Sequence, residues 1–141
     1  MHLLGLDIGT TGCKSIIYTL DGRIVSQAYR ENKIHHPKPG WAEYKVDEIW
    51  SNVKEALKES LTKSKLDPKE VAGLSISSQA ETLIPVDHDG KWLYSAIVWL
   101  DQRGEEQCKW WEENFGKYNL YRITGQHLHP TYTVNKIMWL R

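Results

Sequence analysis

Three short segments rich in aliphatic residues open the chain, at residues 2–8, 14–20 and 23–30. Asp21-Gly22 separates the second segment from the third. This dipeptide is a typical two-residue hairpin signal, because both central positions of such a turn take positive φ. Apolar segments of this length, bounded by turn residues, are typical of strands. The pattern therefore predicts a sheet that opens as a three-stranded antiparallel meander.

A long amphipathic helix is predicted next, after a proline-containing loop at residues 35–45. Hydrophobic residues recur at helical spacing on one face, namely Val46, Ile49, Trp50, Val53, Leu57 and Leu61. Asp67-Pro68 then predicts a short capped turn, since Asp is a favoured N-cap and Pro is favoured at the first helical position. Residues 71–78 predict a further strand made largely of small residues.

The second half of the chain predicts two more strands and two helices. The strands are expected at residues 82–86 and 96–100, with a turn at His88-Asp89-Gly90 between them. One helix is expected over residues 102–115, where Gly116 is a natural stop, and another over residues 133–141. No stop signal follows the last helix, so we expect the sequence to continue in a longer protein.

Composition and charge narrow the class of protein. The 141 residues are 40% hydrophobic and 26% charged, which is ordinary for a globular domain. Eighteen basic and eighteen acidic residues cancel, which argues against a nucleic-acid partner. Cys13 and Cys108 form no disulfide framework and fit no zinc spacing. With no signal peptide and no apolar run of the roughly 20 residues that cross a bilayer, we expect a cytoplasmic protein without a membrane partner.

The most informative stretch is the turn at residues 7–14, which we name the phosphate turn. Its backbone N–H groups can form an anion-binding concavity, and glycine there allows positive φ and close approach of a ligand. Lys14 and the hydroxyls of Thr10 and Thr11 add further donors for phosphate oxygens. A carboxylate beside phosphates implies a cation between them, so Asp7 predicts Mg²⁺ bound through water.

Two other interpretations of this turn remain open on the motif alone. It could be an ordinary hairpin in which Asp and Gly are chosen for turn geometry. It could also belong to a ribonuclease-H-like nuclease, although two-metal chemistry needs further carboxylates and residues 74–78 offer none. The turn fits neither a Walker loop nor a dinucleotide fingerprint, because both of those lead into a helix.

Several further motifs follow in a fixed order along the chain. They are Gly40-Trp41-Ala42-Glu43, residues 77–82 (Ser-Ser-Gln-Ala-Glu-Thr), residues 98–103 (Val-Trp-Leu-Asp-Gln-Arg), Thr124-Gly125 and residues 135–140 (Asn-Lys-Ile-Met-Trp-Leu). Together with Asp7-Ile8-Gly9-Thr10-Thr11, this order resembles the N-terminal domain of the FGGY carbohydrate kinases, a family that includes glycerol, xylulose and gluconate kinases. The resemblance covers essentially the whole chain. It implies an α/β, actin-like and ribonuclease-H-like lobe with a mixed sheet and helices packed on it. Residues 1–141 would form a single partial N-terminal domain, incomplete relative to the family.

The resemblance also implies roles for individual residues. Asp7, Gly9, Thr10, Thr11 and Lys14 would serve ATP, Mg²⁺ and the transferred phosphoryl group. The substrate-side residues would be Gln79, Ala80, Glu81, Trp99, Asp101 and Arg103. Of these, 79–81 would contact substrate hydroxyls and Trp99 would form a wall of the substrate site. A buried Asp101–Arg103 pair would fix the loop that carries this tryptophan.

In this family the catalytic base and the adenosine site lie well beyond residue 141. The resemblance therefore implies that no catalytic residue is present here and that the chain alone is inactive. It would need its missing C-terminal part or a partner chain, and a hydrophobic surface left uncovered could make it self-associate.

Physical chemistry supports these roles but leaves alternatives. A glutamate can accept hydrogen bonds from two hydroxyls, and an indole covers the C–H face of a sugar. Glu81 could instead cap a strand, and Trp99 could belong to the core. Ala80 and Thr131 stand where glycerol kinases carry Arg and Tyr, which argues against glycerol. The smaller residue at 80 leaves room for a larger sugar or sugar acid. A xylulose-kinase-like Met-His pair is also absent at residues 80–81. A non-catalytic actin-like module for sugar binding or assembly is the alternative function.

Overall fold

The computed structural model describes residues 1–141, which form two compact units. The first unit comprises Met1–Lys33 and Lys45–Gln79, and the second comprises Ile34–Tyr44 and Ala80–Arg141. No helix combines the length and the apolar character that a membrane span requires.

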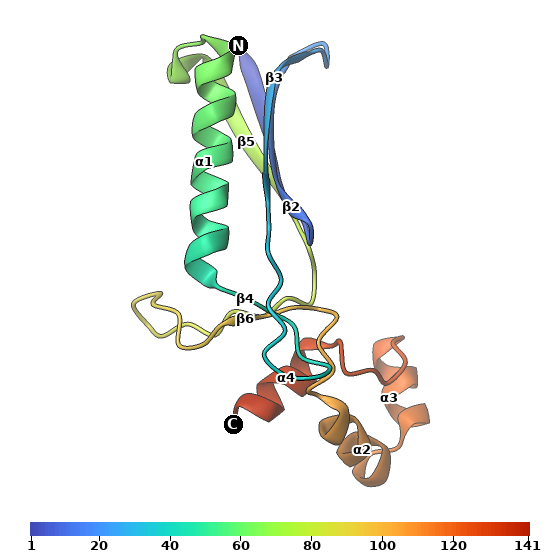
Figure 1. Ribbon diagram of the computed structural model, residues 1–141. Coiled ribbons are helices and arrows are strands. Elements are labelled where there is room, and N and C mark those ends of the chain that lie inside the picture. The colour runs from blue at the N-terminus through green and yellow to red at the C-terminus, as the bar shows by residue number, and fades with distance from the viewer. The chain divides into compact units, whose positions relative to one another are not determined.

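The first unit is a four-stranded mixed sheet with one long helix on it (Figure 1). Its strands β1 (His2–Ile8), β2 (Gly12–Thr19) and β3 (Ile24–Glu31) form the antiparallel meander that the sequence predicts. Helix α1 (Val46–Ser64) and a capped 3₁₀ turn, η1 (Pro68–Glu70), lead to strand β5 (Val71–Ser78), which pairs in parallel with β1. The strand order is β3-β2-β1-β5. A parallel pair needs such a crossover connection, and α1 provides it.

The core of the first unit lies between α1 and the sheet. Leu4, Leu6, Cys13, Ile17 and Val53 form it, and each is at most 5% exposed. Small polar residues let the helix approach the sheet closely: the hydroxyls of Ser15 and Ser60 lie 2.7 Å apart, and the Ser26 hydroxyl donates to the Ser60 carbonyl at 2.7 Å. Burial also raises the pKa of the Cys13 thiol, which keeps this core cysteine neutral.

The predicted buried face of α1 is wrong at one residue, Trp50. Trp50 is 56% exposed, whereas Ala56 and Ser60 are fully buried. The buried stripe of α1 is centred on Val53, Ala56 and Ser60, so Trp50 falls at its edge. Counting only large hydrophobic residues displaced the predicted stripe, because small residues mark the closest contact between helix and sheet.

The predicted two-residue hairpin turn is also wrong. β2 ends at Thr19 and β3 begins at Ile24, so the connection is longer. Gly22 takes positive φ (86°), but Asp21 does not. The Asp21 carboxylate instead accepts hydrogen bonds from the Thr19 hydroxyl at 2.5 Å and from Arg23 Nε at 2.8 Å, which closes the wider turn through side chains.

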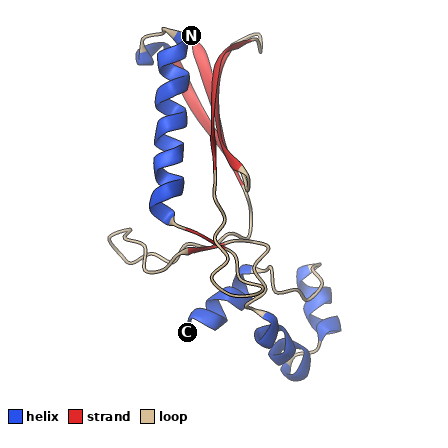
Figure 2. Ribbon diagram, in the orientation of Figure 1, coloured by secondary structure: helices blue, strands red, loops and turns tan.

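The second unit consists of loops, a two-stranded antiparallel sheet and three short helices (Figure 2). The strands are β4 (Glu43–Tyr44) and β6 (Ala96–Ile97), and the helices are α2 (Glu105–Asn114), α3 (Lys117–Thr124) and α4 (Thr133–Leu140). The structure confirms two predicted helices, α2, which ends before Gly116, and α4.

The predicted strand at residues 82–86 is wrong, and the one at 96–100 is reduced to two residues. The first region makes only isolated antiparallel bridges, Leu83 with Ile97 and Val86 with Trp92. Helix α3 was not predicted. None of its residues is buried, and it is bounded by Gly116 and Gly125, both with positive φ.

Candidate functional site

The phosphate turn connects β1 to β2 in the first unit. It is closed by a hydrogen bond from the Gly9 N–H to the Gly12 carbonyl at 2.9 Å. Asp7 and Lys14 are cross-strand partners, and both are exposed. A hollow of about 250 Å³ on this side of the sheet is lined by both residues together with Gly5, Tyr18 and Ser77.

The carbonyl groups of this turn accept hydrogen bonds from residues that the sequence analysis did not single out. The Asn32 side-chain amide donates to the Gly9 carbonyl at 2.9 Å, and the Asn32 N–H donates to the Thr11 carbonyl at 2.9 Å. Tyr29 adds a hydroxyl donor to the same Thr11 carbonyl at 2.9 Å. Asn32 is only 7% exposed and accepts in turn from the Asn52 amide at 3.0 Å. No motif marks Asn32, because its role depends on contacts formed only in the fold.

The two glycines of the turn serve close packing rather than positive φ, which corrects the expectation from the sequence. Neither Gly9 nor Gly12 is among the residues with positive φ. A Cβ at residue 12 would lie 2.4 Å from the Arg30 carbonyl oxygen and 2.4 Å from the Tyr29 ring, so a side chain cannot fit there. A Cβ at residue 9 would lie 3.3 Å from Asp7 Oδ2, so the aspartate carboxylate hangs directly over the turn.

Gln79 lies in the first unit, on the phosphate turn. The Thr10 hydroxyl donates to Gln79 Oε1 at 3.1 Å, and Gln79 Nε2 donates to the Gly9 carbonyl at 3.4 Å. The Gln79 N–H extends the ladder by donating to the Ile8 carbonyl at 2.9 Å. Ala80 and Glu81 follow in the second unit. The structure thus brings Gln79 together with the residues predicted for phosphate, and a contact with substrate stays a prediction.

Glu81 is held in an uncommon backbone conformation by helix α4. Its φ is +61°, and the only other non-glycine residue with positive φ is Lys65, which ends α1. Glu81 Oε2 accepts hydrogen bonds from the N–H and the hydroxyl of Thr133, at 2.8 and 2.6 Å. The hydroxyl bond, and after it the N–H bond, lowers the pKa of the Glu81 carboxyl group and keeps it ionised. The residue therefore caps the N-terminus of α4 rather than a strand, and Oε1 keeps no protein hydrogen bond.

The Glu81 carbonyl is held as firmly as its carboxylate. Lys136, whose side chain is fully buried, donates from Nζ to this carbonyl at 2.6 Å. Burial disfavours the ammonium form and lowers the pKa of Lys136 to about 8, against partial compensation from the charges of Asp101 and Glu81. Sequence reasoning missed both Thr133 and Lys136 as partners of Glu81; the motif at residues 135–140 was the only signal in their region.

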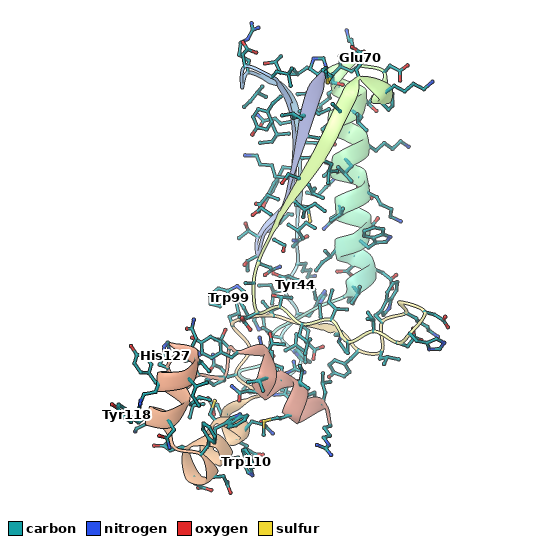
Figure 3. The ribbon with its side chains drawn as sticks, turned by 180° about the vertical axis from the view of Figure 1, so that it is seen from behind. Tyr44, Glu70, Trp99, Trp110, Tyr118 and His127 are labelled. Atoms are coloured by element: carbon teal, nitrogen blue, oxygen red, sulfur yellow. The ribbon has the colours of Figure 1, made fainter.

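Trp99 follows strand β6 and is 42% exposed, so it is not a core residue (Figure 3). Its N–H donates to the Thr82 hydroxyl at 3.3 Å. Its carbonyl accepts from the Thr131 hydroxyl at 2.6 Å. Glu81 and Trp99 are thus tied to the same two stretches of the second unit, residues 81–82 and 131–133. A cavity of about 250 Å³ opens beside Glu81 and is also lined by Trp111, Tyr132, Thr133 and Asn135.

Asp101 and Arg103 form the buried pair that the sequence predicts. Arg103 donates from Nε and Nη2 to the two Asp101 carboxylate oxygens, both at 2.8 Å, and from Nη2 to Glu43 at 2.7 Å. Burial alone would lower the pKa of the guanidinium, but these hydrogen bonds raise it above its ordinary value. The Asp101 carboxylate also accepts from the Ala42 N–H at 2.6 Å. The pair therefore joins residues 42–43 to the loop that carries Trp99.

Comparison with known proteins places this geometry in a family. Residues 2–141 match the model of the N-terminal domain of the FGGY family of carbohydrate kinases. A glycerol kinase of Trichormus variabilis is 35% identical over 140 residues, covering 99% of this chain and 28% of its own length. Among solved structures, ligand-bound xylulose kinase from Lactobacillus acidophilus superposes with a TM-score of 0.88 at 29% identity, over 99% of this chain and 28% of that one. Plasmodium falciparum glycerol kinase with ADP superposes with a TM-score of 0.87 at 29% identity, over the same shares.

The mixed sheet with its packed helices is the actin-like kinase fold, as the sequence predicts. The chain belongs to the FGGY family of carbohydrate kinases. It spans 28% of the length of the glycerol kinase of Trichormus variabilis and 28% of each of the two solved kinases.

Replacing Arg103 by Met should cost about 3–5 kcal/mol of unfolding free energy, because Asp101 and Glu43 would be left without their buried partner. Urea denaturation of the chain measures this. Arg23→Met is the matched control, because Arg23 pairs with Asp21 at the surface and is 79% exposed, and its loss should cost less than about 1 kcal/mol. Equal losses for the two variants would show that the Arg103 cluster contributes nothing special.

The free energy of unfolding should rise with pH, because Lys136 loses its proton at a lower pH in the folded chain than in the unfolded chain. Its pKa is about 8 in the folded chain and near 10.5 when unfolded, so between these values the unfolded chain binds a proton that the folded chain does not. The free energy of unfolding of the wild type, relative to Lys136→Met, should therefore increase above pH 8, by about 1.4 kcal/mol per pH unit. Paired urea titrations at pH 7, 8, 9 and 10 measure the difference, and a flat or falling difference would contradict a buried ammonium.

Proposed function

We propose that the chain supplies the N-terminal part of an ATP-dependent carbohydrate kinase, which transfers the γ-phosphoryl group to a hydroxyl of a sugar, polyol or sugar acid. The observation that carries the proposal is Glu81. An ionised carboxylate is held in a strained backbone with one oxygen tied to Thr133 and the other left to accept a hydroxyl. Sites that hydrogen-bond substrate hydroxyls discriminate strongly, because a missing hydroxyl leaves a buried acceptor unpaired.

Trp99 would provide the second element of the acceptor site, by which we mean the site for the sugar that accepts the phosphoryl group. Its indole is partly exposed, and both backbone groups of this residue are fixed by Thr82 and Thr131. A rigid aromatic face suits the C–H surface of a sugar, while Glu81 suits its hydroxyls. We assign Asp101 and Arg103 the role of fixing this loop, since both are buried and engaged with each other.

The nucleotide would be bound at the phosphate turn, through Gly9, Thr10, Thr11 and Lys14. Plasmodium falciparum glycerol kinase is described with ADP, which supports an adenine nucleotide for this family. Asp7 fits a Mg²⁺ site, because its carboxylate is exposed and lies over the turn at Gly9. A single carboxylate suffices, since Mg²⁺ usually keeps several waters and takes its other ligands from phosphate oxygens. When bound, the ion would neutralise charge on the phosphates; the protein's part is to hold it and orient the turn.

The catalytic base and the adenosine site would come from outside this chain. We propose that they lie beyond residue 141, in the part of a kinase that this chain does not span or in a partner chain. On that view the chain alone binds ligands without turning them over. Leu74 and Ile76 are 51% and 58% exposed on the edge strand β5, so the chain by itself would also tend to self-associate. Two free cysteines fit action in the cytoplasm.

The substrate would be larger than glycerol if residues 80 and 131 set its size. Ala80 is exposed and Thr131 directs its hydroxyl to the Trp99 carbonyl, so neither fills space beside Glu81 as Arg or Tyr would. A five- or six-carbon sugar or sugar acid is therefore the class we propose.

Calorimetric titration of the chain with glycerol, D-xylulose and D-gluconate, with and without MgATP, tests the acceptor site. One compound should bind, and Glu81→Gln should weaken it at least about tenfold, because a neutral amide is a poorer acceptor than a carboxylate. Glu112→Gln is the matched control, since Glu112 is 52% exposed and paired only with Lys117 in the same unit. A folded chain that binds none of these would favour the alternative, a non-catalytic actin-like module.

A further inference from the structure

Glu81 has a backbone conformation that is unfavourable for a residue with a Cβ. Residues with a Cβ rarely take a φ of +61°, and such outliers persist only where the surroundings enforce them. Glu81 is the second residue after Gln79, the last residue of the first unit. Something in the second unit must therefore keep this residue from relaxing to an extended backbone.

Helix α4 holds Glu81 at two separate atoms. Thr133 binds the carboxylate, and Lys136 binds the carbonyl through Nζ at 2.6 Å. The two residues are three apart, so they lie on the same side of the helix. The Thr133 bonds fix where the carboxylate goes, whereas the Lys136 bond fixes the peptide plane from which the side chain leaves.

Burying a lysine is costly, and packing does not require it. The Lys136 side chain is fully buried, and an ammonium loses its hydration there. A methionine would fill similar space without that cost. The charges that face Lys136 come from Asp101 and Glu81, which favour the ammonium, and from Arg103, which opposes it. The single hydrogen bond of Nζ to the Glu81 carbonyl is the contact that only a donor at this position can make.

The same helix is anchored to the Arg103 cluster. Trp139, one turn after Lys136, stacks its ring 4.8 Å from the Arg103 guanidinium and meets the Trp41 ring edge-on at 5.2 Å. The Asn135 amide donates to the His129 carbonyl at 2.9 Å and fixes the start of the helix. Helix α4 is thus a rigid support, able to impose a conformation on Glu81.

We propose that Lys136 is a positioning residue, which locks the Glu81 backbone in the left-handed region so that the carboxylate is presented to the substrate hydroxyls. This role rests on the proposed function of Glu81. Lys136 itself touches no substrate. Without it the peptide would turn toward an extended conformation, and the carboxylate would lose its direction while the fold remained.

The test compares Lys136→Met with Lys117→Met, a matched control whose lysine is 72% exposed on α3 of the same unit. Affinities for glycerol, D-xylulose and D-gluconate are measured by calorimetry well below the melting temperature, so that stability does not enter. Lys136→Met should weaken the compound that binds at least about tenfold, while Lys117→Met should leave it unchanged. A purely structural role would lower the melting temperature and leave the affinity of the folded protein intact.

A second readout does not depend on any ligand. Backbone NMR chemical shifts and one-bond Cα–Hα couplings report the sign of φ at Glu81 in the free chain. We expect positive φ in the wild type and in Lys117→Met, and a shift out of that region in Lys136→Met. If the wild type binds none of the three compounds but the Glu81 signals still change, the proposed function fails and the positioning of Glu81 stands. Unchanged Glu81 signals and unchanged affinity in Lys136→Met would overturn the inference.

Discussion

The second unit depends on one buried guanidinium. Arg103 is 7% exposed and is bonded to Asp101 and Glu43, with the Trp41 ring 4.0 Å from its charged carbon. Its desolvation is offset only because both carboxylates and the aromatic faces are in place, so the cluster forms complete or not at all. This requirement fixes strand β4, the Trp99 loop and helix α4 with respect to one another within the unit.

The candidate acceptor site is built on that support. Helix α4, held by Trp139 against Arg103, carries Thr133 and Lys136 to Glu81. The Asp101 carboxylate, two residues after Trp99, accepts hydrogen bonds from Arg103 and from the Ala42 N–H, which joins the loop to residue 42. A strained glutamate and a partly exposed tryptophan are thus both positioned by groups that contact no ligand. In the first unit, Asn32 likewise positions the phosphate turn, because it donates hydrogen bonds to two carbonyl groups of that turn.

The sequence predicted those features that depend on local pattern. The meander and α1 were predicted because short apolar segments and helical spacing are visible in neighbouring residues, and the capped turn at Asp67 because its residues are adjacent. Residues 82–86 have the composition of a strand but no continuous partner, so only isolated bridges form. Helix α3 was missed because it has only eight residues and no side-chain N-cap marks its start. Asn32 and Lys136 were missed as structural supports because their partners lie 23 and 55 residues away, and nothing local marks such contacts.

We propose that this chain works as the N-terminal part of a carbohydrate kinase. The most direct measurement joins the chain to the remainder of the Trichormus variabilis glycerol kinase, in place of the matching 28% of that protein, and assays ATP-dependent phosphorylation of glycerol, D-xylulose and D-gluconate. We expect turnover of at least one compound, its loss in Asp7→Asn with substrate affinity kept, and normal turnover in Asp21→Asn, whose aspartate lies in the turn at the other end of β2 from the phosphate turn. A folded chimera that binds MgATP and substrate but transfers no phosphoryl group, or one in which Asp7→Asn is fully active, would contradict it.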